Sequence, residues 1–131
     1  MVTAGQSIDS LLERARSTIA RHSPPAAHAR VRDGALLIDI RPAAQRAQFG
    51  EVPGALVIER NVLEWRLDPR SAHRIPEATS HALDVIVLCQ QGYASSLAAA
   101  SLRELGFAQA SDVIGGFDAW VAAGLPNTAG R

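Results

Sequence analysis

Two short apolar runs constrain the fold of this chain more strongly than any other feature. Residues 35–40 and 85–88 are almost wholly aliphatic, and neither shows the polar alternation of a half-exposed strand. A strand that is apolar on both faces belongs in the interior of a sheet that is covered on both sides. We therefore expect both runs to be central strands of such a sheet.

The segments around these runs alternate between helix-like and strand-like patterns. With 131 residues, the chain has the length of one domain with one core. Strands that alternate with helices predict an α/β fold with a mainly parallel sheet. The expected helices cover residues 8–20, 24–31, 43–48, 95–105 and 116–123, with one or two helical turns over 61–67, and the expected shorter strands cover 55–58 and 113–114.

Composition excludes several classes of function. The 13 basic and 13 acidic residues balance, which gives no support for nucleic-acid or anionic-membrane binding. Every basic residue is Arg, so a lysine Schiff base is excluded, and a single cysteine excludes an internal disulfide and a multi-cysteine zinc site. The first residues lack the basic start and apolar core of a secretory signal, and no stretch is apolar enough to cross a bilayer, so we expect a cytoplasmic protein.

Residues that carry chemistry follow the predicted strands directly. In an open α/β sheet, ligands bind outside the carboxyl ends of the strands. Asp39 and Arg41 come at the end of the first strong strand, Arg60 follows the short strand after it, and Cys89 follows the second strong strand. The pattern thus predicts one thiol and two guanidinium groups at the same edge.

The loop after Cys89 has the features of an anion site. It contains Gly92 and leads into the helix that we expect Ser95 to begin, so its peptide N–H groups and the helix dipole favour a negative charge. Such surroundings favour the thiolate of a cysteine. The alternative is that Cys89 is only a small buried apolar residue, which is common for a lone cysteine after an aliphatic strand.

At this point the sequence resembles the single-domain rhodanese (thiosulfate sulfurtransferase) family. Four segments carry the resemblance in order: Leu-Leu-Ile-Asp-Ile-Arg at 36–41, Gly-Glu-Val-Pro-Gly-Ala at 50–55, the loop at 89–95, and Gly-Gly-Phe-Asp-Ala-Trp at 115–120 with Gly-Leu-Pro at 124–126. The resemblance implies a three-layer sandwich with a mainly parallel five-stranded sheet and helices on both faces. It divides the chain into an N-terminal helix and lead-in (1–22) and a rhodanese-like domain (23–131).

The resemblance implies a sulfurtransferase that needs no cofactor or metal. Cys89 is the expected nucleophile, which takes sulfane sulfur from thiosulfate or a persulfide and passes it as a persulfide to a thiophilic acceptor. Its implied partners are a small-molecule donor and acceptor, a protein sulfur acceptor being the further partner, with no nucleic acid and no membrane. The expected substrate-binding residues are Gln90, Gln91, Gly92, Tyr93, Ala94, Ser95 and Arg60, supported by Asp39 and Arg41.

Two positions of the cysteine loop bear on activity: one departs from the family pattern and one differs from cysteine phosphatases. Many rhodaneses carry Arg where this chain has Ala94, which favours the alternative of a sulfur-carrier or regulatory module without turnover. Cysteine phosphatases carry Arg where this chain has Ser95, which disfavours phosphate chemistry. A redox-sensing thiol is a third interpretation, and it needs a partner thiol from outside the chain.

The arginines also have structural alternatives. Arg60 is either a donor-binding residue or a surface side chain paired with Glu59 or Glu64. Asp39 either bonds to amides of the loop or forms a salt bridge with Arg41, and for Arg41 itself we expect a role in the fold.

Overall fold

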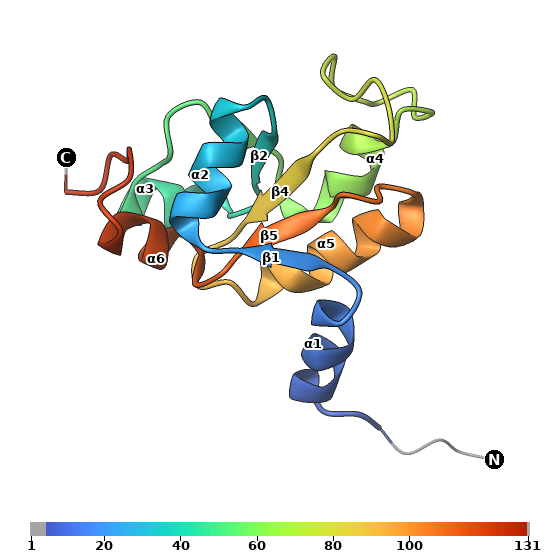
Figure 1. Ribbon diagram of the computed structural model, residues 1–131, viewed down its shortest axis with the longest axis horizontal. Coiled ribbons are helices and arrows are strands. Elements are labelled where there is room, and N and C mark those ends of the chain that lie inside the picture. The colour runs from blue at the N-terminus through green and yellow to red at the C-terminus, as the bar shows by residue number, and fades with distance from the viewer. Residues whose placement is uncertain (1–4, 131) are drawn as a thin grey trace.

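The computed structural model describes residues 5–130, and its centre is a five-stranded parallel sheet (Figure 1). The strands stand in the order β1-β5-β4-β2-β3, and every neighbouring pair runs parallel. The prediction of an α/β fold with a mainly parallel sheet is confirmed. The strands are β1 (Ala20–His22), β2 (Leu36–Asp39), β3 (Leu56–Val57), β4 (Val85–Leu88) and β5 (Ser111–Val113).

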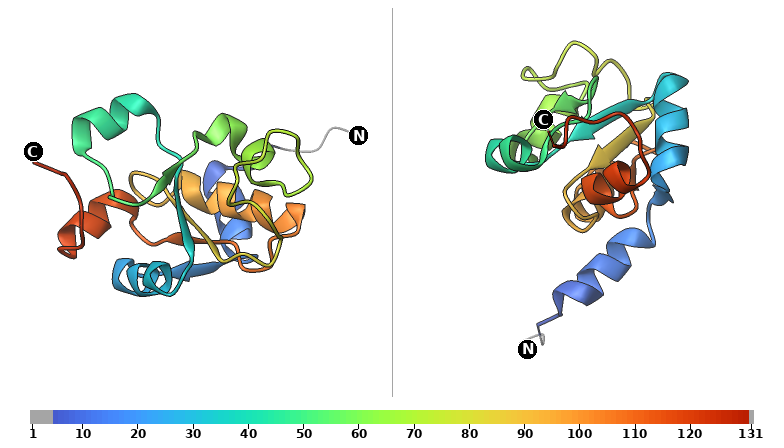
Figure 2. Two further views of the ribbon diagram at one scale, coloured as in Figure 1. Left: turned by 90° about the horizontal axis from the view of Figure 1, so that it is seen from above. Right: turned by 90° about the vertical axis from the view of Figure 1, so that its left-hand side faces the viewer.

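Helices cover both faces of the sheet and complete three layers (Figure 2). Buried residues of α4 and α5 share one core with one face of the sheet, and those of α2 and α6 share a second core with the other face. The helices are α1 (Ile8–Arg16), α2 (Pro24–Arg32), α3 (Ala43–Phe49), the 3-10 turn η1 (Arg60–Val62), α4 (Leu63–Leu67), α5 (Ala94–Leu105) and α6 (Gly116–Ala122).

Strand β4 is the buried centre of this arrangement, as its aliphatic sequence predicts. Val85 and Val87 pack into the core on the α5 side, while Ile86 and Leu88 pack into the core on the α2 and α6 side. The register places the end of β2 beside the end of β4, so the residues that follow both strands emerge at one edge. Burial on both faces therefore fixes the position of Cys89, which follows β4 directly.

The N-terminal segment differs from the sequence prediction of one helix over 8–20. Helix α1 ends at Arg16. The hydroxyls of Ser17 and Thr18 donate to the carbonyls of Arg14 and Ala15, which the N–H groups of residues 18 and 19 would bind if the helix continued. Such side-chain bonds to nearby backbone compete with helix continuation. The chain then extends into β1, a strand that the sequence did not suggest and that pairs with β5.

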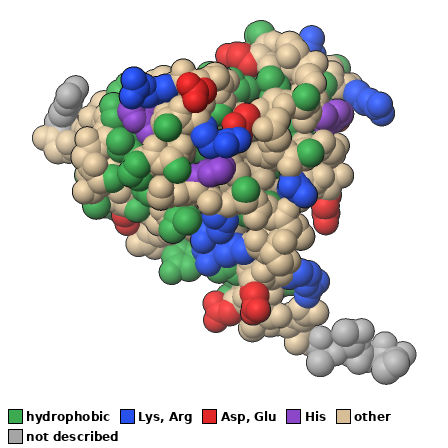
Figure 3. Space-filling view, viewed as in Figure 1, with side chains coloured by type: hydrophobic (Ala, Val, Ile, Leu, Met, Phe, Trp, Pro, Cys, Tyr) green, Lys and Arg blue, Asp and Glu red, His purple; other side chains and the backbone are tan. Residues whose placement is uncertain are grey.

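Helix α1 projects from the body of the molecule and packs on α5 (Figures 1 and 2). Basic and acidic side chains are interspersed over the face seen in Figure 3, in keeping with the balanced charge of the chain. None of the helices within residues 5–130 combines the length and the apolar character needed to span a bilayer.

Candidate functional site

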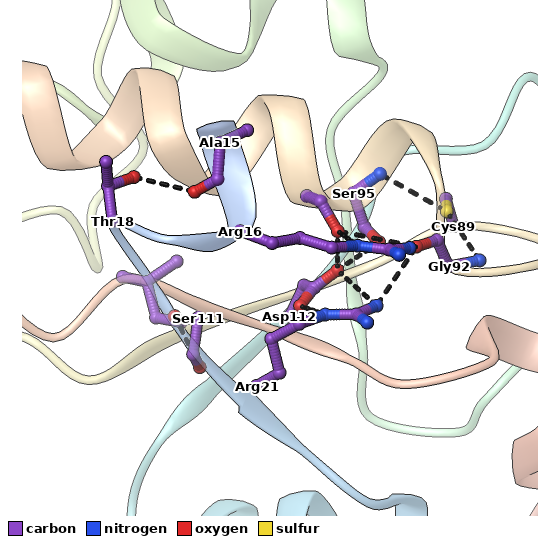
Figure 4. A network of polar contacts seen from close by, with 11 residues as sticks. Ala15, Arg16, Thr18, Arg21, Cys89, Gly92, Ser95, Ser111 and Asp112 are labelled. Carbon is purple, nitrogen blue, oxygen red and sulfur yellow. Dashed lines mark hydrogen bonds and ion pairs between the residues drawn. The ribbon is translucent and has the colours of Figure 1, made fainter. Parts of the chain in front are cut away.

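The sulfur of Cys89 lies inside the loop that joins β4 to α5 (Figure 4). Its Sγ accepts hydrogen bonds from the backbone N–H groups of Gly92, at 3.1 Å, and Ser95, at 3.3 Å. The residue is 6% exposed and lines a small open pocket of about 190 Å³. The sulfur is therefore held by peptide donors at the N-terminus of α5, where the helix dipole also favours negative charge. The pocket is lined by Gln45, Cys89, Gln90, Gln91, Tyr93 and Ala94.

Two glycine turns in contact shape this loop. Gly92 has φ +87°, and a Cβ on it would lie 2.7 Å from the backbone nitrogen of Gly115. Gly116 has φ +62°, and a Cβ there would lie 2.5 Å from the carbonyl oxygen of Cys89. That carbonyl accepts the N–H of Phe117 at 2.8 Å. Only glycine permits both the positive φ and the close approach, so the 115–116 segment acts as a support for the cysteine loop.

A buried ion pair holds the loop from the side of β2. Arg41 and Asp39 are each 1% exposed, and the guanidinium donates to the Asp39 carboxylate at 2.8 to 3.2 Å. The remaining Nη1 of Arg41 donates to the side-chain carbonyl of Gln90 at 2.9 Å, and the guanidinium lies 4.1 Å from the ring centre of Phe117. Asp39 thus forms the salt bridge and bonds to no amide of the 89–95 loop. Arg41 contacts the loop through Gln90 rather than the sulfur.

A buried carboxylate in β5 holds the start of α5. Asp112 is fully buried and accepts the hydroxyls of Ser95 at 2.8 Å and Ser96 at 2.7 Å, besides an ion pair with Arg21. Helix α5 begins at Ala94, one residue before the predicted start at Ser95, and the Ser95 hydroxyl donates to Asp112 instead of capping the helix. Ser95 reaches the sulfur through its N–H instead. A charged residue inside the short strand Ser-Asp-Val was the one signal in the sequence for this network.

Arg60 does not line the pocket at Cys89. Its Nη1 donates to both carboxylate oxygens of Glu64 at 3.0 Å, which is the surface pair that the sequence left open. Burial alone would raise the pKa of Glu64, but hydrogen bonds from Ser101 and the backbone, together with Arg60, hold that pKa below its usual value of 4.5. The exposed Trp65 lies in a separate hollow with Glu64, whereas the exposed Tyr93 lines the pocket.

The part of the chain that the structure describes contains no group of three or more His, Cys, Asp or Glu side chains arranged to hold a metal ion.

The fold and site define a class of α/β protein in which a central parallel strand delivers a cysteine into a loop of peptide N–H donors. The model of the rhodanese-like domain matches residues 23–123. The chain therefore belongs to the rhodanese-like family, as the sequence resemblance indicated.

Sulfurtransferases are among its relatives. The chain is 34% identical over 91 residues to a sulfurtransferase of Allochromatium vinosum, covering 70% of this chain and 76% of that protein. It is 33% identical over 94 residues to the thiosulfate sulfurtransferase GlpE of Actinobacillus succinogenes, covering 72% and 76%. It is 39% identical over 85 residues to the adenylyltransferase and sulfurtransferase MOCS3-2 of Zea mays, but the match covers 65% of this chain and only 17% of that much longer protein.

Solved structures agree with the fold. A protein of unknown function from Rhodopseudomonas palustris, described as a possible tyrosine phosphatase, is 28% identical with a TM-score of 0.86 and covers 98% of both chains. The polysulfide-sulfur transferase homodimer of Wolinella succinogenes has a TM-score of 0.75 at 24% identity, covering 92% of this chain and 85% of its own. This second similarity concerns the fold.

Proposed function

We propose that this chain is a rhodanese-type sulfurtransferase in which Cys89 is the nucleophile. The observation that carries the proposal is the position of its Sγ, which accepts the N–H groups of Gly92 and Ser95 while lining an open pocket. Peptide donors of this kind stabilise a thiolate and, after the first step, a persulfide anion. Its proposed partners are a sulfur donor and a thiophilic acceptor, protein acceptors included.

The reaction consists of two displacements at sulfur. The Cys89 thiolate attacks the outer sulfur of the donor, which forms an S–S bond to Sγ and breaks the S–S bond of the donor. The electron pair of that bond leaves with sulfite when the donor is thiosulfate, or with a thiolate when the donor is a persulfide. A thiophile such as cyanide then attacks the outer sulfur of the enzyme persulfide, and the bonding pair returns to Sγ.

The charge of the pocket bears on the choice of donor. None of the six side chains that line it carries a formal positive charge, and Arg60, the donor-binding residue that the sequence suggests, is paired with Glu64. A dianionic donor such as thiosulfate gains most from a guanidinium, because hydrogen bonds between charged groups are the stronger ones. This favours a persulfide donor over thiosulfate, because Arg60 could contact thiosulfate only after leaving Glu64.

Mass spectrometry of the intact protein tests the proposal. After treatment with thiosulfate, or separately with a low-molecular-weight persulfide, the wild-type protein should gain the mass of one sulfur atom, and the gain should disappear on addition of cyanide. Cys89→Ser, which keeps the size of the side chain but not the nucleophile, should gain nothing. A wild-type protein that gains no sulfur from either donor would refute the assignment.

The absence of a guanidinium among the pocket residues also favours a second candidate, a sulfur-carrier or regulatory module that does not turn over. Steady-state assays with thiosulfate and cyanide separate the two. Turnover that is lost in Cys89→Ser supports the enzyme. A wild-type protein that forms the persulfide once and shows no turnover with any donor and acceptor pair supports the module.

The local structure disfavours the phosphatase description that one structural relative carries. Six positions after the cysteine, where cysteine phosphatases carry Arg, this chain has Ser95, and its hydroxyl donates to the buried Asp112. No guanidinium is thus available from that position to bind phosphate in a bidentate manner.

A further inference from the structure

The segment of α1 and β1, which precedes residues 23–123, contacts the cysteine loop at Gly92. Arg16, the last residue of α1, donates from Nη2 to the carbonyl oxygen of Gly92 at 2.8 Å, and Arg21 of β1 donates to the same oxygen at 3.1 Å. Both residues lie outside residues 23–123, where the rhodanese-like model matches. One loop carbonyl therefore accepts hydrogen bonds from two guanidinium groups, while the N–H of the same residue donates to the sulfur of Cys89 (Figure 4).

The two arginines are not equivalent. Arg21 is neutralised by the buried Asp112, with which it forms a bidentate pair at 2.8 and 3.2 Å. Arg16 forms no ion pair with a carboxylate among residues 5–130. Its Nε donates to the hydroxyl of Ser96 at 3.0 Å, and its guanidinium lies 5.6 Å from the ring centre of Tyr93. Arg16, Arg21 and Asp112 together therefore carry one net positive charge, and that charge belongs to Arg16.

This arrangement connects the two arginines to both residues whose N–H groups donate hydrogen bonds to the sulfur of Cys89. The N–H of Gly92 binds the sulfur, and the carbonyl of the same residue accepts hydrogen bonds from both arginines. Ser95, the second donor, is held by Asp112, which also accepts the Ser96 hydroxyl that Arg16 contacts. Fixing peptide groups before reaction removes the cost of reorienting them when negative charge develops on sulfur.

We propose that Arg16 is a positioning residue for Cys89: its cation binds the carbonyl of Gly92, which holds in place the loop residue whose N–H donates to the sulfur, and it supplies the positive charge that favours the thiolate and the persulfide anion. The ion pair between the partly buried Arg21 and the fully buried Asp112 lies beside this contact and supports it. The proposal rests on Cys89 being the nucleophile of the proposed function, and it assigns to the α1–β1 segment a role in thiol reactivity. The other charged groups near the loop are the Asp39–Arg41 pair and Asp118, both of which bond to Gln90.

The rate of alkylation of Cys89 tests this role independently of sulfur transfer. In the intact chain at pH 7, Arg16→Gln should react with iodoacetamide about three- to tenfold more slowly than wild type. This is less than the full loss of a charge-assisted hydrogen bond, because Arg21 still binds the Gly92 carbonyl in the variant. The loss should be larger with the anionic reagent iodoacetate. Arg16→Lys keeps the charge but cannot bond to both Gly92 and Ser96 through a planar guanidinium. Its alkylation rate should therefore lie between those of the wild type and Arg16→Gln.

A role that is only structural predicts the opposite sign, because a loosened loop exposes a residue that is now 6% exposed and speeds its alkylation. Arg14→Gln is the matched control, since Arg14 lies in the same helix and bonds to Gln6 rather than to the loop. Unchanged or faster alkylation of Arg16→Gln, at an unchanged melting temperature, would overturn the proposal. If the wild type forms no persulfide but Arg16→Gln is alkylated more slowly, the proposed function fails and the positioning role stands.

Discussion

Substitution of Gly92 by alanine examines how closely the geometry of the loop controls the sulfur. An alanine at this position has to adopt φ +87°, and its Cβ would lie 2.7 Å from the nitrogen of Gly115 and 3.2 Å from the nitrogen of Gly116. Gly54 offers a matched control, because it has nearly the same φ, +86°, with no atom within 4 Å of its added Cβ. The two variants share the backbone strain and differ in the steric clash.

The expected magnitudes follow from these two contributions. Gly54→Ala should lower the free energy of unfolding by about 1–2 kcal/mol, the cost of a left-handed conformation for an L-residue. Gly92→Ala should lose a further ~1–3 kcal/mol, because backbone atoms, which cannot rotate away, have to shift to admit the methyl group. Urea denaturation followed by fluorescence measures both losses.

The same shift should change chemistry only at Gly92. Moving the loop lengthens the 3.1 Å bond from the Gly92 N–H to the Cys89 sulfur. A hydrogen bond to a charged group contributes about 1.5–3 kcal/mol, so the rate of persulfide formation should fall roughly ten- to hundredfold. Gly54→Ala should keep the wild-type rate. If the two variants are equally stable and equally fast, close contact of the glycine turns does not define the site and our reasoning about the loop is wrong.

Two further predictions concern charge. Asp39→Asn leaves the buried guanidinium of Arg41 without its counter-ion and should lower the free energy of unfolding by about 3–5 kcal/mol in urea denaturation; a loss near zero would mean that water reaches the arginine. Despite its burial, Glu64 has a pKa below 4.5 in the folded protein, because Ser101 and Arg60 stabilise its carboxylate. The ionised carboxylate therefore stabilises the fold above pH 4.5. This contribution is lost as the pH falls through the lower pKa of the folded state. Glu64→Gln should therefore be less stable than wild type at pH 7, with the difference shrinking in acid, and a difference independent of pH would contradict this account.

The sequence predicted those features that depend on local pattern. Strand β4 could be predicted to the residue because burial on both faces demands an unbroken aliphatic run, and the loop after it followed from Cys89 and Gly92. Strand β1 could not, because the residues Ala20–His22 carry no alternation, and they form a strand only by pairing with β5. Tertiary context of this kind overrides local propensity.

The parts of the site that escaped prediction depend on contacts between residues far apart in the chain. Arg16 and Arg21 meet Gly92 across more than 70 positions, and no spacing rule connects a helix C-terminus to a loop that follows a distant strand. For Arg60, a contact between residues near each other in the chain decided the outcome. Its place after a short strand suggested a substrate contact, but Glu64 lies one helical turn away and pairs with it.

The network beneath the loop explains why the edge strand β1 and the cysteine depend on each other. A fully buried carboxylate such as Asp112 is tolerated only when it is paired and hydrogen-bonded. Its cation is Arg21, which stands directly opposite it in the register of β1 and β5. Its hydroxyl donors include Ser95, whose N–H binds the sulfur of Cys89. The division of the chain at residue 22 is thus a proposal about where the family sequence begins, and the ion pair between Arg21 and Asp112 crosses that boundary. Without β1, Asp112 would lose its counter-charge. Ser95, which binds the sulfur through its N–H, would then lose the fixed carboxylate that accepts its hydroxyl.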